Sequence, residues 1–162
     1  MTKVATTLRS AYLAGPMRGH PGLNFEEFHR KTAWLRKENW RVFSPAERDE
    51  ADPVLNGDFS VGQERGLDYY MQYDLAAVAQ TDCVICLEGW ETSQGARLET
   101  MVAVELGHPV FEIVRSGLAR QLTLKSVDNA RVAAEFIAGT RAYDGLPTVK
   151  APERVLTAWE FE

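Results

Sequence analysis

Residues 82–106 read DCVICLEGWETSQGARLETMVAVEL, and this stretch decides the fold class. It opens with a short apolar run, Asp82 to Leu87, which has the length of a buried strand. A turn containing Gly89 follows, and Gln94 to Leu106 then has apolar residues at helical spacing, ended by Gly107. A buried strand joined by a short turn to an amphipathic helix is the repeating unit of parallel α/β sheets.

The same alternation of strands and helices extends on both sides of this unit. Strands are predicted at Ala11 to Ala14, Trp40 to Phe43 and Pro109 to Val114, and helices at Asn24 to Asn39 and Leu67 to Gln80. Asn24 and Glu27 have the spacing of a capping box. We expect a helix at Asn129 to Ala138 and a last strand at Arg141 to Tyr143. This order predicts an α/β fold with a mostly parallel sheet of about five strands and helices on both faces.

Ligands of such sheets bind beyond the carboxyl ends of the strands, near helix N-termini. The rule points to three segments, Gly15 to Gly22, Ser44 to Gly66 and Gly89 to Gly95. Within the second segment, Ala46 to Gly66 has few apolar residues, and we expect a long functional connection there.

Composition excludes several classes of protein. The chain has 162 residues, 45% hydrophobic and 25% charged, which is the balance of one globular domain over residues 1–162. The net charge of −5 argues against a nucleic-acid polymer as partner but permits a small anion in a local pocket. No apolar run approaches the roughly 20 residues that span a bilayer, so we expect no membrane partner. Met1 to Ser10 lack the apolar core of a secretory signal, and we therefore expect a cytoplasmic protein.

The cysteine and histidine residues do not form a metal-binding pattern. Cys83 and Cys86 have C-x-x-C spacing, but they lie within the predicted strand, whose period of two places them on opposite faces. The histidines His20, His29 and His108 lack metal-ligand spacing. We therefore predict two small core cysteines, no metal site and no cofactor.

Two acidic residues fall on the apolar faces of their predicted helices. On a helical wheel, Glu99 lies in the middle of a stripe formed by Ala96, Val102, Ala103 and Leu106, with Thr100 elsewhere. Asp74 lies likewise among Leu67, Tyr70, Met71, Ala77 and Val78. A carboxylate facing the core is costly unless it is paired, hydrogen-bonded or protonated, so two such acids indicate a functional site. The alternative is that each acid caps a loop or pairs with a buried arginine.

A candidate anion site precedes Glu99. Ser93 and Gly95 lie at the predicted helix start, where backbone N–H groups and a hydroxyl can bind an anion. Gly15 to Gly19 follow the first strand and supply a cationic partner, Arg18. Each feature has an ordinary explanation as well, because a glycine after a strand often forms a turn and a serine before a helix is often its N-cap.

These residues together resemble the nucleoside 2-deoxyribosyltransferase superfamily, including the (deoxy)nucleoside 5′-monophosphate N-glycosidases and phage-type deoxyribosyltransferase-like proteins. The resemblance rests on three segments: Tyr12-Leu13-Ala14-Gly15-Pro16-Met17-Arg18-Gly19, Asp74-Leu75 with the strand after Asp82, and Ser93-Gln94-Gly95-Ala96-Arg97-Leu98-Glu99. It covers about residues 10–114, and residues 115–162 remain unassigned.

The resemblance implies a flavodoxin-like (Rossmann-like), doubly wound fold and a homo-oligomer, often a dimer. It implies that Glu99 attacks C1′ of the sugar, that Asp74 holds and protonates the base, and that Tyr12 orients Glu99. The implied phosphate and sugar site consists of Gly15, Met17, Arg18, Gly19, Ser93 and Gly95. Around the base we expect Asp49, Asp58 or Phe59, together with Trp90, for which core packing is an equally good interpretation.

Several functions stay open at this point. The first is hydrolysis of a nucleoside monophosphate, and the second is transfer of its sugar to another base. A third is a binding module that sequesters a nucleotide or nucleoside without cleaving it. The tryptophans Trp34, Trp40, Trp90 and Trp159 could instead form a surface for a protein partner, which we weigh least. In each of the first three cases the expected partner is a small-molecule nucleotide or nucleoside.

Overall fold

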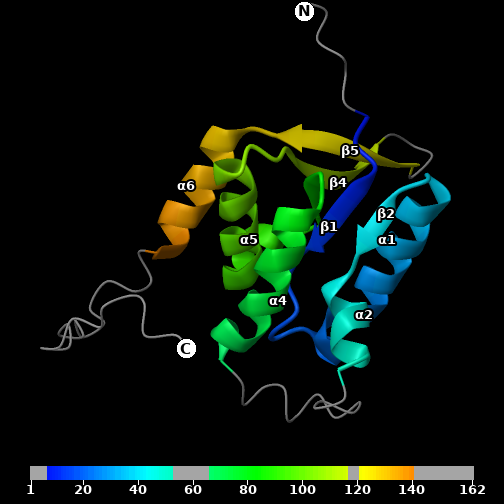
Figure 1. The fold of residues 1–162 in the computed structure, drawn as a ribbon, viewed down its shortest axis with the longest axis horizontal. Coiled ribbons are helices and arrows are strands. Elements are labelled where there is room, and N and C mark those ends of the chain that lie inside the picture. The colour runs from blue at the N-terminus through cyan, green and yellow to red at the C-terminus, as the bar shows by residue number, and fades with distance from the viewer. Residues whose placement is uncertain (1–6, 53–65, 117–120, 141–162) are drawn as a thin grey trace, which may run out of the picture.

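The computed structural model describes residues 7–52, 66–116 and 121–140, which build a single sheet with helices around it (Figure 1). The sheet has the strand order β2-β1-β3-β4-β5. The strands are β1 (Ser10–Ala14), β2 (Arg41–Phe43), β3 (Cys83–Cys86), β4 (Val110–Ser116) and β5 (Gln121–Val127). β1 pairs in parallel with β2 and β3, and β3 pairs in parallel with β4. The predicted α/β class and mostly parallel sheet are confirmed, and the arrangement is consistent with a flavodoxin-like fold.

The fifth strand differs from the prediction. β5 runs antiparallel to β4, with Val110 opposite Val127, and the two strands form a hairpin at the edge of the sheet. The strand predicted at Arg141 to Tyr143 lies outside the described residues. A parallel neighbour needs a long crossover, whereas a short connection after β4 permits only an antiparallel return.

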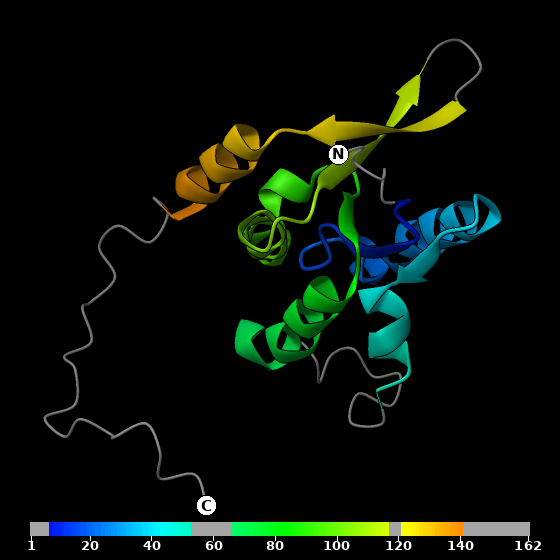
Figure 2. The same cartoon turned by 45° about the horizontal axis from the view of Figure 1, so that its top comes forward.

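Helices cover both faces of the sheet (Figure 2). α1 (Phe25–Lys37) packs on one face, and α4 (Leu67–Gln80) and α5 (Gln94–Glu105) pack on the other. α6 (Asn129–Thr140) lies against α5. The short helices are η1 (Pro21–Asn24), α2 (Pro45–Glu50) and η2 (Trp90–Thr92). None of the described helices is both long and apolar enough to cross a membrane.

The central strands divide the core into two layers. In β1, Leu13 packs in the layer beneath α1, whereas Tyr12 packs in the layer beneath α4 and α5. Cys83 and Cys86 fall in opposite layers in the same way, both buried and both free, as the strand period predicts. The two-sided burial explains why β1 and β3 are apolar at every position except Ser10.

The carboxyl ends of β1 and β3 are held close together. The backbone N–H of Leu87 donates to the carbonyl of Ala14 at 2.8 Å. A Cβ built on Gly15 would lie 2.9 Å from the Cβ of Leu87, so a larger residue has no room. Gly15 is therefore required by strand packing, and this separates its role from the phosphate contact implied by the resemblance.

Three local predictions are wrong. α2 occupies the first part of the predicted connection Ala46 to Gly66, because Pro45 is well suited to the first turn of a helix. Asn24 has left-handed backbone angles and donates from Nδ2 to the carbonyl of Pro16 at 2.9 Å, so no capping box forms. On α5, Thr100 is fully buried, and Leu106 is 51% exposed because the helix ends at Glu105 and Leu106 is its C-cap.

Candidate active site

A cavity of about 310 Å³ lies at the carboxyl edge of the sheet, and we call it the first cavity. Four parts of the chain surround it: β1 with the loop after it, α2, α4, and the start of α5. Much of its wall is apolar, including Leu23, Pro45 and Met71. The structure brings these predicted site residues to its wall: Tyr12, Gly15, Met17, Arg18, Asp49, Asp74, Ser93, Gly95 and Glu99.

Tyr12 and Glu99 form a buried hydrogen bond at the base of this site. The hydroxyl of Tyr12 donates to Oε1 of Glu99 at 2.8 Å. Tyr12 is fully buried on β1, and its ring stacks on Phe43 with 5.7 Å between ring centroids. Glu99 is 5% exposed and lies in the middle of the buried face of α5. The stacked ring fixes the phenol, and the phenol in turn orients the carboxyl group.

Burial changes the proton affinity of Glu99 and its neighbours. Burial, with the charge of Asp74 added to it, raises the pKa of Glu99 to about 8, although the bond from Tyr12 opposes the rise. Burial and the nearby Glu99 raise the pKa of Tyr12 well above its usual value, so Tyr12 remains a neutral donor. When the pair of Tyr12 and Glu99 ionises, the carboxyl group therefore loses its proton and the phenol keeps its own.

Asp74 lies on α4 and is 5% exposed. Its Oδ1 is buried without a hydrogen-bond partner among the described residues. Burial, followed by the charge of Asp49, raises the pKa of Asp74 to about 7. A buried carboxyl oxygen without a partner is rare in folded proteins and is compatible with a group that meets a ligand. Near neutral pH such a group can hold a proton and deliver it.

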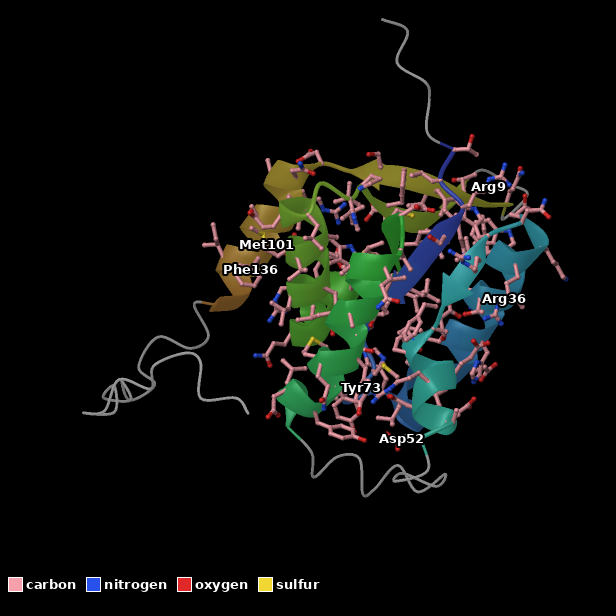
Figure 3. All side chains as sticks on the ribbon, viewed as in Figure 1. Arg9, Arg36, Asp52, Tyr73, Met101 and Phe136 are labelled. Atoms are coloured by element: carbon pink, nitrogen blue, oxygen red, sulfur yellow. The ribbon has the colours of Figure 1, made fainter. Side chains whose placement is uncertain are left out.

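Asp49 is a third acid on the wall of the first cavity. It lies on α2, is 6% exposed and accepts from Nη1 of Arg48 at 2.7 Å. Burial raises the pKa of Asp49, although Arg48 opposes the rise. Arg48 lies 4.1 Å from the centre of the Tyr73 ring, and its Nη2 lies 3.8 Å from Oδ2 of Asp52. Figure 3 labels Tyr73 on α4 and Asp52 just after α2.

The start of α5 forms the opposite end of the wall. Ser93 is the N-cap, and its Oγ accepts from the backbone N–H of Ala96 at 3.2 Å. A Cβ on Gly95 would lie 3.4 Å from Cε of Met71 and 3.9 Å from Oε1 of Glu99, so glycine keeps space open beside Glu99. Arg18 lies 5.5 Å from the centre of the Tyr70 ring. This end combines a helix N-terminus with a guanidinium group, which suits an anion.

Some predicted site residues lie elsewhere. Trp90 is 1% exposed and belongs to the core layer beneath α4 and α5, so its placement at the mouth of this cavity is wrong and core packing is correct. Gly19 is exposed with a φ of 79° and does not line the cavity, because its backbone turns away from it. Phe59 and Asp58 lie outside the described residues. Sequence reasoning missed Tyr70 as a wall residue, although it lies one turn before Asp74.

A second cavity of about 370 Å³ lies on the other side of the segment after β3. Three of the acids that line it, Glu27, Glu91 and Glu112, are paired with basic side chains. Oε1 of Glu27 lies 2.9 Å from Nζ of the buried Lys31. Burial raises the pKa of Glu27, but the hydrogen bonds from Lys31 and Arg30 outweigh this effect and hold that pKa below its usual value. Arg131 contacts Glu112 at 2.9 Å and Glu91 at 2.7 Å. Trp90 lines this cavity.

The chain belongs to the family described as "Domain of unknown function (DUF4406)", which matches residues 9–112. The matched range begins before β1 and ends within β4, so it includes every described side chain of the first cavity. No curated protein matches the chain. Among the described residues, no group of three or more His, Cys, Asp or Glu side chains is arranged to hold a metal ion.

Proposed function

We propose that the protein hydrolyses the N-glycosidic bond of a (deoxy)nucleoside 5′-monophosphate through a covalent intermediate on Glu99. One observation carries the proposal: two buried carboxyl groups face one cavity, Glu99 oriented by Tyr12 and Asp74 with an unpartnered oxygen. Cleavage at C1′ of a sugar needs a carboxylate on one side of the ring and a proton donor for the leaving group on the other.

In the first step, a carboxylate oxygen of Glu99 forms a bond to C1′ while the bond from C1′ to the base nitrogen breaks. The electron pair of the broken bond goes to the base, and the proton of Asp74 neutralises it. The products are free base, ionised Asp74 and a sugar phosphate esterified to Glu99. The transition state has oxocarbenium character, which the negative charge of Glu99 stabilises.

In the second step, a water molecule attacks C1′ and the ester bond to Glu99 breaks. The carboxylate of Asp74 accepts the proton that the water loses, so both acids return to their starting forms. The net reaction consumes one water and yields a free base and a sugar 5-phosphate. The same intermediate would give base exchange if a second base attacked in place of water.

The reactive form of the site has Glu99 ionised and Asp74 protonated. The hydrogen bond that Tyr12 donates at 2.8 Å stabilises the charged form of Glu99, although Tyr12 also opposes the rise in the pKa of Asp74. With pKa values of about 8 for Glu99 and about 7 for Asp74, the pair holds one proton near neutral pH, more often on Glu99 than on Asp74. Substrate binding must therefore shift this proton to Asp74. Activity should therefore fall on both sides of this range.

The remaining wall of the cavity suits the phosphate and sugar of a nucleotide. The volume of about 310 Å³ lies at the lower end of the range for small-molecule sites. We assign the 5′-phosphate to Arg18 and the start of α5 at Ser93 and Gly95. The resemblance of Tyr12 to Gly19 and of Ser93 to Glu99 to the monophosphate glycosidases supports the same assignment.

Base release tests the proposal. The purified protein would be incubated with ribo- and deoxyribonucleoside 5′-monophosphates and with the matching nucleosides, and chromatography would detect free base. We expect release from monophosphates by the wild type and none by Glu99→Gln. Release only in the presence of a second free base would make the protein a transferase. Nucleotide binding without release, equal in both proteins, would replace the proposal with a binding module.

A further inference from the structure

The first cavity contains one acid more than the chemistry at C1′ requires. Glu99 and Asp74 complete the two steps described above, and Asp49 has no part in either step. Asp49 nevertheless faces the same space from α2, on the side of Asp74, and its side chain is only 9% exposed. Arg48 compensates for part of the cost of burying this carboxylate through Oδ1, and the other oxygen is left for a ligand group in the cavity.

The hydrogen bonds of Asp49 leave part of its carboxylate free. Arg48 donates to Oδ1, and within the described residues the carboxylate makes no other hydrogen bond. Arg48 is the closest charge to it and favours its ionised form. An ionised carboxylate can only accept hydrogen bonds, so a ligand group that meets the other oxygen of Asp49 in the cavity must be an N–H or O–H donor.

Asp74 has the complementary hydrogen-bonding character. It carries the proton that the leaving base receives, so it is a donor before the reaction. Asp49 and Asp74 therefore present an acceptor and a donor from adjacent parts of one wall. The matching edge of a base has an amino group beside an unprotonated ring nitrogen. Adenine has this arrangement at its 6-amino group and N7, and cytosine has it at its 4-amino group and N3.

This inference rests on the proposed function, since it assigns the leaving group of the same reaction. We propose that Asp49 is a specificity-determining residue that accepts a hydrogen bond from the amino group of the base while Asp74 donates to the adjacent ring nitrogen. The preferred substrates are then nucleotides of amino-bearing bases. A base with a carbonyl group at that position places its oxygen against the Asp49 carboxylate, and neither oxygen has a proton to share.

The experiment compares matched nucleotide pairs. Values of kcat/KM for base release would be measured for deoxyadenosine against deoxyinosine monophosphate and for deoxycytidine against deoxyuridine monophosphate. In at least one pair, the wild type should cleave the nucleotide with the amino group roughly 10- to 100-fold faster. This ratio is what one matched pair of hydrogen bonds at a base edge contributes to discrimination. Asp49→Asn should make the members of that pair nearly equal, because an amide can donate to a carbonyl.

Glu50→Gln is the matched control, because Glu50 lies on the same helix but is exposed and pairs with His29. It should retain the wild-type preference. If Asp49→Asn does not fold, the wild type alone still tests the inference with the unsubstituted purine nucleotide, which lacks the amino group. That nucleotide should react roughly tenfold more slowly than its adenine counterpart.

The outcomes separate the inference from the function on which it rests. No base release from any nucleotide would contradict the proposed function itself. Base release with equal rates within every pair, or with faster release of the carbonyl-bearing member, would overturn the role of Asp49 and leave the function intact. A preference that persists unchanged in Asp49→Asn would also overturn it.

Discussion

Both cavities lie near the carboxyl ends of the strands and both are lined by acids. The first differs because two of its three acids, Glu99 and Asp74, are buried without a salt bridge among the described residues, whereas Asp49 is paired with Arg48. In the second cavity, Glu27 contacts Lys31 at 2.9 Å, and Glu112 contacts Arg131 at 2.9 Å. In the first cavity, Glu99 has a neutral phenol as its partner, and Oδ1 of Asp74 has none among the described residues.

The difference teaches how to tell a structural acid from a functional one. In a paired acid, hydrogen bonds and charge attraction offset much of the desolvation penalty of burial, so such an acid can have a purely structural role. An unpaired buried acid destabilises the fold, and its neutral form is favoured. On this reasoning we infer that the paired acids of the second cavity support the fold, and we propose that the first cavity performs chemistry.

The largest contrast is expected between Glu99→Gln and Glu112→Gln. Both changes replace a carboxylate by an amide of nearly the same shape. Glu99→Gln removes the nucleophile and should lower kcat/KM for base release by roughly 10⁴-fold or more. Glu112→Gln should leave it within about tenfold of the wild type, because that acid pairs with Arg131. Equal losses in steady-state assays of the two variants would contradict the division.

Asp74→Asn should have the next largest effect. An amide cannot deliver the proton that the leaving base needs, and general acid catalysis contributes roughly 10²- to 10⁴-fold. The loss should be much smaller for a synthetic glycoside whose leaving group departs as a stable anion. Measuring both substrates with the same variant separates proton delivery from a general defect. Equal losses with both would show that Asp74 serves binding or folding.

These contrasts depend on positions that the sequence could predict only in part. Glu99 and Asp74 are found by helical period alone, and α4 has the predicted bounds, because a regular helix fixes which side chains share a face. The period does not predict the exposure of Leu106, because that residue is the C-cap of α5 and the position of a helix end is not set by the period.

Irregular segments were less predictable for a different reason. Trp90 follows a turn in which Gly89 has a φ of 81°, and no repeat period fixes the direction of a side chain there. The hydrogen bond of Tyr12 to Glu99 joins residues 87 positions apart, and only the resemblance implied it. By contrast, α2 could have been predicted, because Ser44-Pro45 has the residue types of a helix start.

Tyr12→Phe should have a smaller effect that depends on pH. Loss of the donated hydrogen bond disfavours the ionised form of Glu99, so its pKa should rise further above its usual value. The acidic limb of the profile of kcat/KM against pH should move to higher pH, and activity at neutral pH should fall roughly 10- to 100-fold. A uniform loss without movement of that limb would show that Tyr12 acts only in packing.

The smallest effect concerns the free energy of unfolding. A carboxylate-to-amide change should raise it in the first cavity at high pH and lower it in the second cavity. Since the pKa of Glu99 is raised on folding, the folded state binds more protons than the unfolded state between about pH 4.5 and pH 8. Ionised Glu99 therefore lowers the free energy of unfolding as pH rises through this range. At pH 9, Glu99→Gln should be more stable than the wild type by on the order of 2 kcal/mol, and at pH 4 the two should agree.

Glu112→Gln is again the comparison, because it weakens the contact with Arg131. It should lower the free energy of unfolding by about 1 kcal/mol at neutral pH. Urea unfolding at several pH values measures both variants. A destabilised Glu99→Gln at pH 9 would mean that Glu99 supports the fold, as the acids of the second cavity do.

The most direct test of the central claim is to trap the sugar on Glu99. A 2′-fluoroarabinosyl analogue of a nucleotide that releases its base would slow hydrolysis of the intermediate, because fluorine destabilises the oxocarbenium-like transition state. Acid quenching and peptide mass spectrometry would then locate the adduct. We predict a sugar phosphate on Glu99 in the wild type and in Glu112→Gln, and none in Glu99→Gln. A sugar attached to another residue, or base release that persists in Glu99→Gln, would contradict the account.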